Sequence, residues 1–107
     1  MVLSEGMIFF NFNHAMQQAK ELDEIAANLS NLASSDFEGT MQNISMNWKG
    51  ENARKYLSKG EQLRSDMCST AGSLRGVASE IRIVAKRVYD AEMQALAIAR
   101  TREYNNI

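Results

Sequence analysis

The side chains that could carry out chemistry are few in this sequence, and they lie far apart. There is one histidine, His14, and one cysteine, Cys68. His14 has no cysteine or carboxylate at the spacing of zinc ligands, and a single cysteine forms no disulfide within the chain and no cysteine metal site. We therefore predict no metal site. We interpret His14 as a surface residue and Cys68 as a small, partly buried residue.

Three carboxylates, Glu21, Asp23 and Glu24, are close enough in sequence to suggest acid–base catalysis. Catalysis also needs a cleft that holds a substrate, and a chain built from long helices does not easily form one. We interpret the cluster as a solvated helix surface. Gly72 and Gly76 are not followed by the Lys-Ser/Thr pair of a phosphate-binding loop. The sequence therefore predicts no enzyme activity and no cofactor.

The charge balance argues against nucleic acid as a partner. Lys and Arg number 12 and Asp and Glu number 13, a formal net charge of -1 at pH 7. The densest basic stretch holds Arg82, Lys86 and Arg87, and Glu80 and Asp90 interrupt it. A nucleic-acid binder normally carries a continuous basic stripe. We interpret this stretch as a solvated helix face, with an anion-binding face as the alternative.

The composition is typical of an all-α protein with long helices. The 107 residues include no proline, which most globular domains carry in loops and at helix ends. No signal peptide is visible, and no apolar run reaches the roughly 20 residues that span a bilayer. We expect one domain, residues 1–107, that is made in the cytoplasm and does not use the general secretory route.

Apolar and small residues recur at alternating steps of three and four through the second half. This heptad spacing predicts a helix over about residues 53–102, packed along another helix, and a frayed tail at 103–107. The predicted stripe consists of Ala53, Tyr56, Gly60, Leu63, Met67, Thr70, Leu74, Val77, Ile81, Val84, Val88, Ala91 and Ala95, and it is widened by Leu57, Ala71, Ala78 and Ala85. Gly60 would let another backbone approach closely. Gly72 and Gly76 lie near the edge of the stripe, where they could mark a bend.

The first half has the same spacing and predicts a helix over about residues 5–46. Its stripe consists of Phe9, Phe12, Met16, Ala19, Leu22, Ala26, Leu29 and Ala33, with Ile25 and Leu32 alongside, and it continues through Phe37, Met41, Ile44 and Trp48. Ser4 is in position to cap the start of this helix. The pattern weakens around residues 34–36, where Ser35 and Glu38 have the spacing of a capping box. We expect a kink or a new helix start there.

A short link, residues 47–52, joins the two halves. Gly50 can take a positive φ and end the first helix, and Asn52 can cap the second. So short a link between two amphipathic helices forces them to run antiparallel. The sequence therefore predicts an all-α fold in the form of an antiparallel two-helix hairpin.

The link contains Trp48-Lys49-Gly50, close to the centre of a proline-free chain of 107 residues. In its length, the position of this motif and the two flanking helices, the whole chain resembles the WXG family of type VII secretion proteins. The resemblance implies that Trp48 packs at the hairpin tip against a partner subunit. It also implies that the hairpin pairs into a four-helix bundle, either with itself or with another helical hairpin.

The sequence departs from the family in one respect. Substrates of the family often carry an export signal, Tyr-x-x-x-Asp/Glu, after the second helix. Tyr89 is followed four residues later by Met93, and Tyr56 by Gly60. Tyr104 has no residue four positions on, and no phenylalanine is followed at that distance by an aspartate. The resemblance then implies that a partner supplies the signal. Small helical targeting partners of LXG toxins, which bind the toxin's N-terminal helical domain, would be one such case.

Two helices have no interior that could bury every large apolar side chain of this sequence, so we expect another chain to cover some of them. The predicted interface residues are Phe9, Phe12, Met16, Phe37, Met41, Ile44, Trp48, Tyr56, Leu63, Met67, Leu74 and Ile81. Packing within the chain is the alternative for these residues. We expect a protein partner, no nucleic acid and no membrane insertion.

These features predict a small helical protein of the bacterial type VII secretion system that acts by protein–protein binding. It would be a targeting factor or chaperone-like partner for a larger exported toxin, or a co-secreted dimeric substrate. It would be cytoplasmic when made, and export by the type VII system stays open. The alternative is a structural coiled-coil adaptor subunit of a cytoplasmic assembly.

Overall fold

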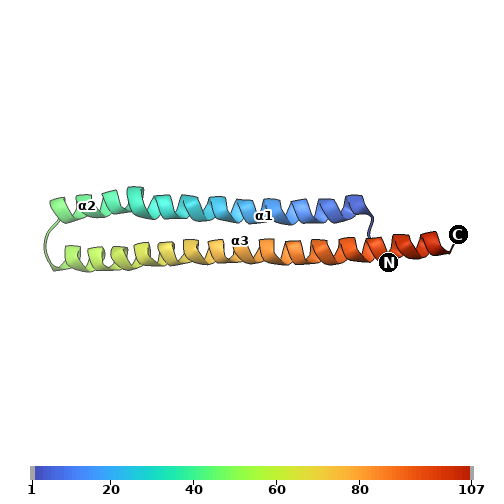
Figure 1. Ribbon diagram of the computed structural model, residues 1–107. Helices are drawn as coiled ribbons and strands as arrows, with labels where there is room; N and C mark the ends of the chain where they lie inside the picture. Colours follow the sequence, from blue (N-terminus) through green and yellow to red (C-terminus); the bar gives the residue numbers. More distant parts are fainter. Residues whose placement is uncertain (1, 107) are drawn as a thin grey trace. The chain divides into compact units, whose positions relative to one another are not determined.

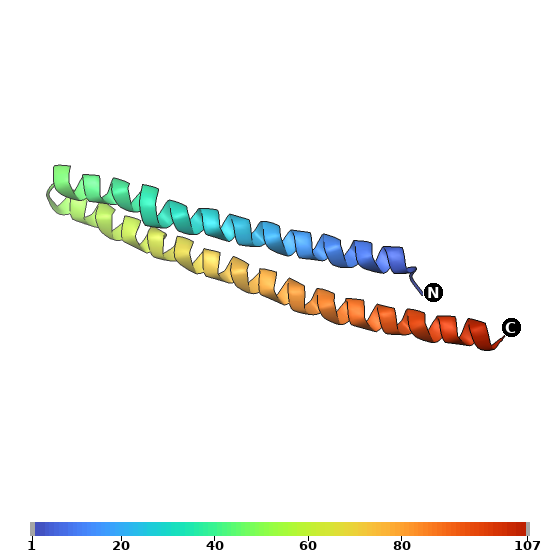
Figure 2. The same cartoon turned by 45° about the horizontal axis from the view of Figure 1, so that its top comes forward.

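The computed structural model describes residues 2–106, which fold into helices joined by one short turn (Figures 1 and 2). In chain order, the elements are the α-helix α1 (Glu5–Asn31), the π-helical segment η1 (Leu32–Phe37), and the α-helices α2 (Glu38–Asn47) and α3 (Glu51–Asn105). None of the described residues forms a strand. The predicted all-α class is confirmed. None of the helices within residues 2–106 is long and apolar enough to cross a membrane.

The contacts of the chain group into two units, each of which is described by itself. The terminal unit contains the first part of α1, up to Glu21, and the part of α3 from Val77 onward. The turn unit is Leu22–Gly76, which contains the end of α1, η1, α2, the turn and the start of α3. Met1 and Ile107, the outer ends of the predicted domain, lie outside the described residues, and Ile107 is also the last residue of the predicted tail.

In the terminal unit, α1 begins where Ser4 caps it. The Met7 backbone N–H donates a hydrogen bond to Ser4 Oγ at 3.3 Å, and the Ile8 N–H donates to the Ser4 carbonyl at 3.0 Å. The predicted cap is confirmed, and it pairs an amide that the start of a helix would otherwise leave unpaired. At the other end of the chain, α3 continues to Asn105, so residues 103–105 of the predicted tail are helical.

In the turn unit, the predicted break near residue 35 is a π-helical segment and not a new helix start. The Ser35 hydroxyl donates to the Asn31 carbonyl at 2.7 Å, and the Thr40 hydroxyl donates to the Asp36 carbonyl at 3.1 Å. Phe37, just before α2, has helical φ and ψ of -68° and -44°, with no capping side chain. The predicted capping box is therefore wrong. Ser35 bonds back to the preceding turn, as serine and threonine can do inside helices.

The turn consists of Trp48, Lys49 and Gly50 alone. Trp48 is extended, with φ -129° and ψ 128°, and its N–H donates to the Ile44 carbonyl at 2.9 Å to close α2. Gly50 has a φ of +109°, a conformation that residues with a side chain rarely adopt. This reverses the chain within three residues, so the start of α3 runs antiparallel beside α2 (Figures 1 and 2). The predicted turn and the positive φ at Gly50 are confirmed.

The cap predicted for the second helix is wrong. Asn52 lies inside α3, which begins one residue earlier, at Glu51. The carbonyl of Gly50 accepts a hydrogen bond from the Arg54 N–H at 3.1 Å. Because the backbone already reverses at Gly50, the first helical hydrogen bond forms there and leaves Asn52 in the first turn.

The helices contact one another through small residues in both units. The buried residues are Ile8, Ala19, Ala78 and Ala85 in the terminal unit, and Ala26, Ala33, Met41, Ala53 and Ala71 in the turn unit. Most are alanines, and they recur every seven residues in parts of α1 and α3. Side chains this small let two helix backbones approach closely. They also bury little apolar area, so each contributes little hydrophobic stabilisation.

The predicted stripe on α3 has the right period, but only part of it faces the chain's own helices: Ala53 is buried, and Gly60, Met67, Leu74 and Ile81 are half-buried. Ala71, Ala78 and Ala85, which only widen the predicted stripe, are buried. Tyr56, Leu63, Val77 and Val84, which belong to the stripe itself, are between 44% and 57% exposed. Where alanines let the helices approach closely, little room remains between them for larger side chains. These therefore lie on the outer flank of α3.

Candidate partner-binding site

The side chains that could carry out chemistry are not brought together into a reactive centre. His14 is exposed and stacks on Phe10, with ring centroids 6.0 Å apart and an interplanar angle of 3°. Cys68 is exposed, so the expectation that it is partly buried is wrong. Its position directly after Met67 places it outside the half-buried seam of α3. Within residues 2–106, no three His, Cys, Asp or Glu side chains lie close enough together to hold a metal ion.

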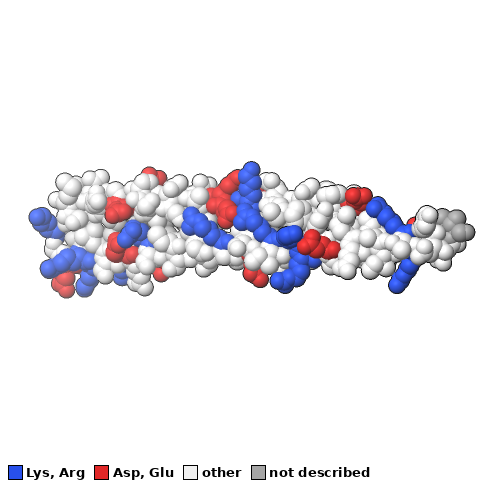
Figure 3. All heavy atoms as spheres, viewed as in Figure 1, with Lys and Arg blue, Asp and Glu red and all other residues white. Residues whose placement is uncertain are grey.

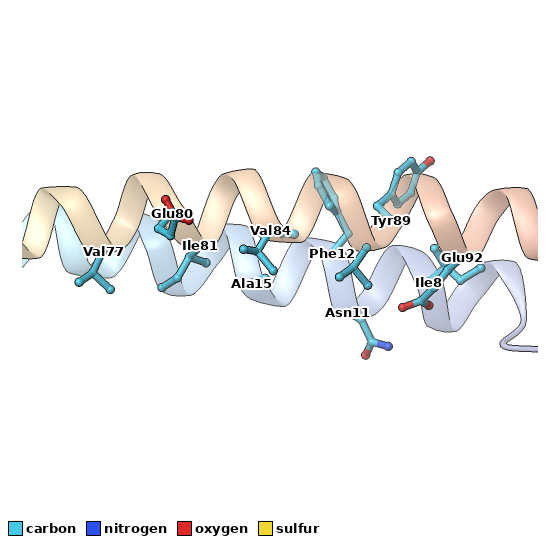
Figure 4. A pocket seen from close by; sticks show the side chains of 12 residues that line it. Ile8, Asn11, Phe12, Ala15, Val77, Glu80, Ile81, Val84, Tyr89 and Glu92 are labelled. Carbon is cyan, nitrogen blue, oxygen red and sulfur yellow. The ribbon is translucent and has the colours of Figure 1, made fainter.

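An apolar groove lies between α1 and α3 in the terminal unit (Figure 4). Its volume is about 480 Å³. The α1 side is formed by Ile8, Phe12 and Ala15, and the α3 side by Val77, Ile81, Val84, Ala85, Val88 and Tyr89, with Asn11, Glu80 and Glu92 as the polar lining residues. Figure 4 shows Val77 at one end of the row along α3, and Glu92 near Ile8 at the other end.

The α3 wall of the groove is a row of four aliphatic side chains. Val77, Ile81, Val84 and Val88 follow one another at steps of four, three and four residues. This is the spacing of residues that pack against a neighbouring helix. Val77, Val84 and Val88 are 51%, 44% and 46% exposed. Each of them directly precedes a residue that is buried or half-buried, namely Ala78, Ala85 and Tyr89. The row is therefore open to solvent along one side.

Aromatic contacts hold the α1 wall in place. The Phe12 ring lies 5.0 Å from the Tyr89 ring, at an interplanar angle of 49°, and the Phe9 ring lies 5.6 Å from it at 53°. Tilted aromatic pairs at such distances are favourable beyond their buried area. Arg100 and Glu5 form an ion pair between the same two helices, with Nη2 and Oε2 3.2 Å apart. The aromatic cluster thus leaves Phe12 half-buried at the edge of the groove.

Glu92 brings a carboxylate into this apolar setting. The side chain as a whole is half-buried, but its Oε2 atom is buried and has no hydrogen-bond partner among the described residues. Buried polar atoms are nearly always paired, because leaving one unpaired costs about 1–3 kcal/mol. Glu92, which lines the groove, therefore holds a carboxylate oxygen whose hydrogen-bonding capacity is unused.

The turn unit exposes a second apolar surface, next to the turn. The Trp48 and Tyr56 rings meet edge to face, with centroids 5.8 Å apart and an interplanar angle of 62°. Trp48 is 48% exposed and Tyr56 is 57% exposed. Met46 and Leu63, in the same unit, are also exposed. The aromatic pair orders the turn and leaves much of both rings in solvent.

The predicted interface residues differ in how accessible they are. Phe9, Trp48, Tyr56 and Leu63 are exposed; Phe12, Met16, Phe37, Ile44, Met67, Leu74 and Ile81 are half-buried; and Met41 is buried. Met41 packs within the turn unit, where a Cβ added at Gly60 would collide with its Sδ and Cε atoms. Gly60 therefore makes room for a side chain, and the expectation that it admits another backbone is wrong.

Charged side chains of both signs are interspersed on the face seen in Figure 3. In the predicted basic stretch, Lys86 Nζ lies 3.3 Å from Asp90 Oδ2. In the turn unit, Arg64 Nη2 lies 2.6 Å from Glu61 Oε1. The hydrogen bond from Arg64 and the charge of its guanidinium lower the pKa of the Glu61 carboxyl. The same pairing raises the pKa of Arg64.

Of the twelve residues that line the groove, the predicted interface contains only Phe12 and Ile81, and Tyr89 and Glu92 are among those that it lacks. A signal for Tyr89 exists in the sequence. In a hairpin that turns at Gly50, opposite residues have numbers that sum to about 100, and this sum places Tyr89 opposite Phe12. The same sum places Glu92 opposite Ile8, but a glutamate in a helix normally predicts a solvated surface, so its residue type hid its position.

Comparison with known proteins adds no relative. No protein-family model, no curated protein and no solved structure matches this chain. The resemblance to the WXG family therefore stays a prediction based on Trp48-Lys49-Gly50 and its flanking helices.

Proposed function

We propose that this chain is a helical binding subunit of a bacterial type VII secretion system. It would act as a targeting factor or chaperone-like partner for a larger exported toxin, or as a co-secreted dimeric substrate. In either role its hairpin would pair with another helical hairpin, or with the N-terminal helical domain of an LXG toxin, to form a four-helix bundle.

One observation carries the binding part of the proposal. The buried residues are mostly alanines, while the exposed set includes Phe9, Trp48, Tyr56, Leu63 and Val84. Exposed large apolar side chains concentrated on the helices of a small protein mark surfaces that bind other proteins. Helices also gain most of their stability from packing against other elements. A helical partner would supply the packing that an alanine seam alone does not.

The secretion part of the proposal is supported by the turn. The tripeptide Trp48-Lys49-Gly50 forms the whole connection between α2 and α3, and Gly50 has the positive φ that the motif's glycine permits. Trp48 is held by Tyr56 but stays half-exposed, in a position to contact a second chain.

The test is co-expression of the full chain with proteins encoded beside it, followed by size-exclusion chromatography with light scattering. We expect a stable complex with a helical neighbour. A stable homodimer that binds none of the co-expressed proteins would count against the targeting-factor role. A monomer that binds none of them would overturn the binding proposal.

A matched pair of variants sharpens this test. Leu63→Asp places a charge on an exposed apolar position, and Gln62→Asp places the same charge on an exposed polar neighbour. We expect Leu63→Asp to reduce complex formation at unchanged helix content, and Gln62→Asp to leave it intact.

A structural coiled-coil adaptor is the second candidate, and the length of α3 favours it. This helix runs for 55 residues and keeps exposed apolar residues at heptad spacing. Fractionation of a bacterial culture separates the two candidates. An adaptor stays in the cytosol and associates neither with the secretion machinery nor with exported clients.

A further inference from the structure

We infer that the groove of the terminal unit binds an amphipathic helix of a partner protein that carries one lysine or arginine, and that this basic residue pairs with Glu92. The inference deepens the proposed function, on which it rests for the existence of a helical protein partner. It names the chemistry of that partner and one pair of residues at the contact.

The shape of the groove fits a helix. Val77, Ile81, Val84 and Val88 extend along about 16 Å of α3, at about 1.5 Å per residue. Phe12 and Ile8 form the opposite wall on α1. Large side chains spaced at three and four residues on a partner helix would fit between two such walls, as in other complexes where a helix occupies a groove.

The charge of the groove determines the polar part of the partner. Among the residues that line it, only Glu80 and Glu92 are charged, and both are acidic. Glu92 Oε2 is buried and has no hydrogen-bond partner within residues 2–106. Two cations of the terminal unit have other carboxylate partners: Lys86 pairs with Asp90 and Arg100 pairs with Glu5. A lysine or arginine of the partner would form a charge-assisted hydrogen bond with the Glu92 carboxylate once that side chain turns toward the groove.

The same charges argue against a second copy of this chain as the occupant. In a symmetric dimer built on this groove, each copy would bring its own Glu80 and Glu92 to the contact. Four carboxylates would then meet in an apolar interface with no basic lining residue to compensate them, which is unfavourable. We therefore assign the groove to a different, basic chain.

The first experiment selects peptides on the full chain from a displayed library of amphipathic helices. Each peptide has about 18 residues, or five turns, with apolar residues at heptad positions and random residues between them. We expect enrichment of Lys or Arg at one fixed position next to the apolar stripe. Selection on Glu92→Gln should lose this preference. Selection on Glu103→Gln, an exposed carboxylate farther along α3, should keep it. No enrichment, or the same preference on Glu92→Gln, overturns the inference.

The second experiment measures the coupling between one selected peptide and Glu92. Replacing the basic residue of the peptide with glutamine should weaken its binding to the wild-type chain at least about tenfold, and its binding to Glu92→Gln less than about twofold. Equal losses on both chains overturn the pairing. If circular dichroism shows that Glu92→Gln is unfolded, the affinities of the two peptides for the wild-type chain decide the question. An affinity that does not change when the basic residue of the peptide is replaced overturns the pairing.

Light scattering tests the second copy as the occupant. A dimer of the free chain that Val84→Asp converts to a monomer would show that the groove binds another copy, and would overturn the inference. Failure of the proposed function has a different signature. In that case the peptides bind as described, but no protein encoded beside this chain forms a complex with it.

Discussion

Met41 and Gly60 lie opposite each other in the turn unit, and the Met41 thioether occupies the space that a Cβ at Gly60 would need. Gly60→Ala should therefore force Met41 out of its buried position and destabilise the chain by about 1–3 kcal/mol, the usual range for overpacking. Urea unfolding followed by circular dichroism measures this change.

The matched control is Gly72→Ala, in the same helix and the same unit. A Cβ at Gly72 would meet nothing within 4 Å, so this substitution gains helix propensity without a clash. We expect it to stabilise the chain by up to about 1 kcal/mol. If both alanine variants shift stability in the same direction, the Met41 contact is not the reason for glycine at position 60.

Gly50 gives a second prediction, because its φ of +109° is unfavourable for a residue with a side chain. Gly50→Ala should destabilise the chain by about 1–2 kcal/mol through backbone strain at the turn. Lys49→Ala, next to it in the turn and exposed, should change stability by less than about 0.5 kcal/mol. Thermal melts of the two variants measure the difference, and equal melting temperatures would show that the turn carries no strain.

The pair of Glu61 and Arg64 predicts how stability depends on pH. Because the pKa of Glu61 is lowered in the folded chain, its contribution is fully present above the ordinary glutamate pKa of about 4.3. It is lost as the pH falls through the lower, folded pKa. Urea midpoints measured between about pH 5 and pH 3 should fall less for Glu61→Gln than for the wild type.

The effect should be small and should shrink at high salt, because both groups are at the surface. Glu103→Gln removes another exposed carboxylate and serves as the control. A wild-type pH profile that coincides with that of Glu61→Gln would contradict the assigned pairing.

Trp48 gives a prediction about binding. It is 48% exposed and contacts Tyr56, so Trp48→Ala removes a large accessible ring and leaves the helices on either side intact. We expect Trp48→Ala to weaken partner binding more than it lowers helix content. Co-purification and circular dichroism on the same samples measure both, with Lys49→Ala as the control. Unchanged affinity would remove Trp48 from the interface.

The elements of the fold were predictable because their signals are local. Ser4 caps α1 through its own neighbours, and Gly50 is the residue type that a positive φ requires. The side-chain hydrogen bond of Ser35 was not predictable, since a serine hydroxyl can accept a hydrogen bond from a following amide or donate one to a preceding carbonyl. The spacing of residues around it does not distinguish these two roles.

The sequence also did not show which side of α3 faces α1, that is, the phase of its apolar stripe. A heptad pattern gives the period of the contact, but two neighbouring edges of α3 share that period. Ala78 and Ala85 form one edge, and Val77 and Val84 form the other. Which edge faces α1 depends on how closely the helices approach, and that distance is a property of the folded chain. Glu92 was missed for the same reason, because its burial follows from the phase.

Two adjacent residues of α3, Ala78 and Val77, belong to the edge that faces α1 and to the open edge, respectively. Ala78 is fully buried and Val77 is 51% exposed. Ala78→Leu should destabilise the free chain by about 1–3 kcal/mol, because no room for a larger side chain exists where α3 meets α1. Val77→Leu adds one methylene on the open side and should change stability by less than about 0.5 kcal/mol. Urea unfolding of the free chain measures both, and if Val77→Leu proves the more damaging of the two, the edges of α3 have been assigned the wrong way round.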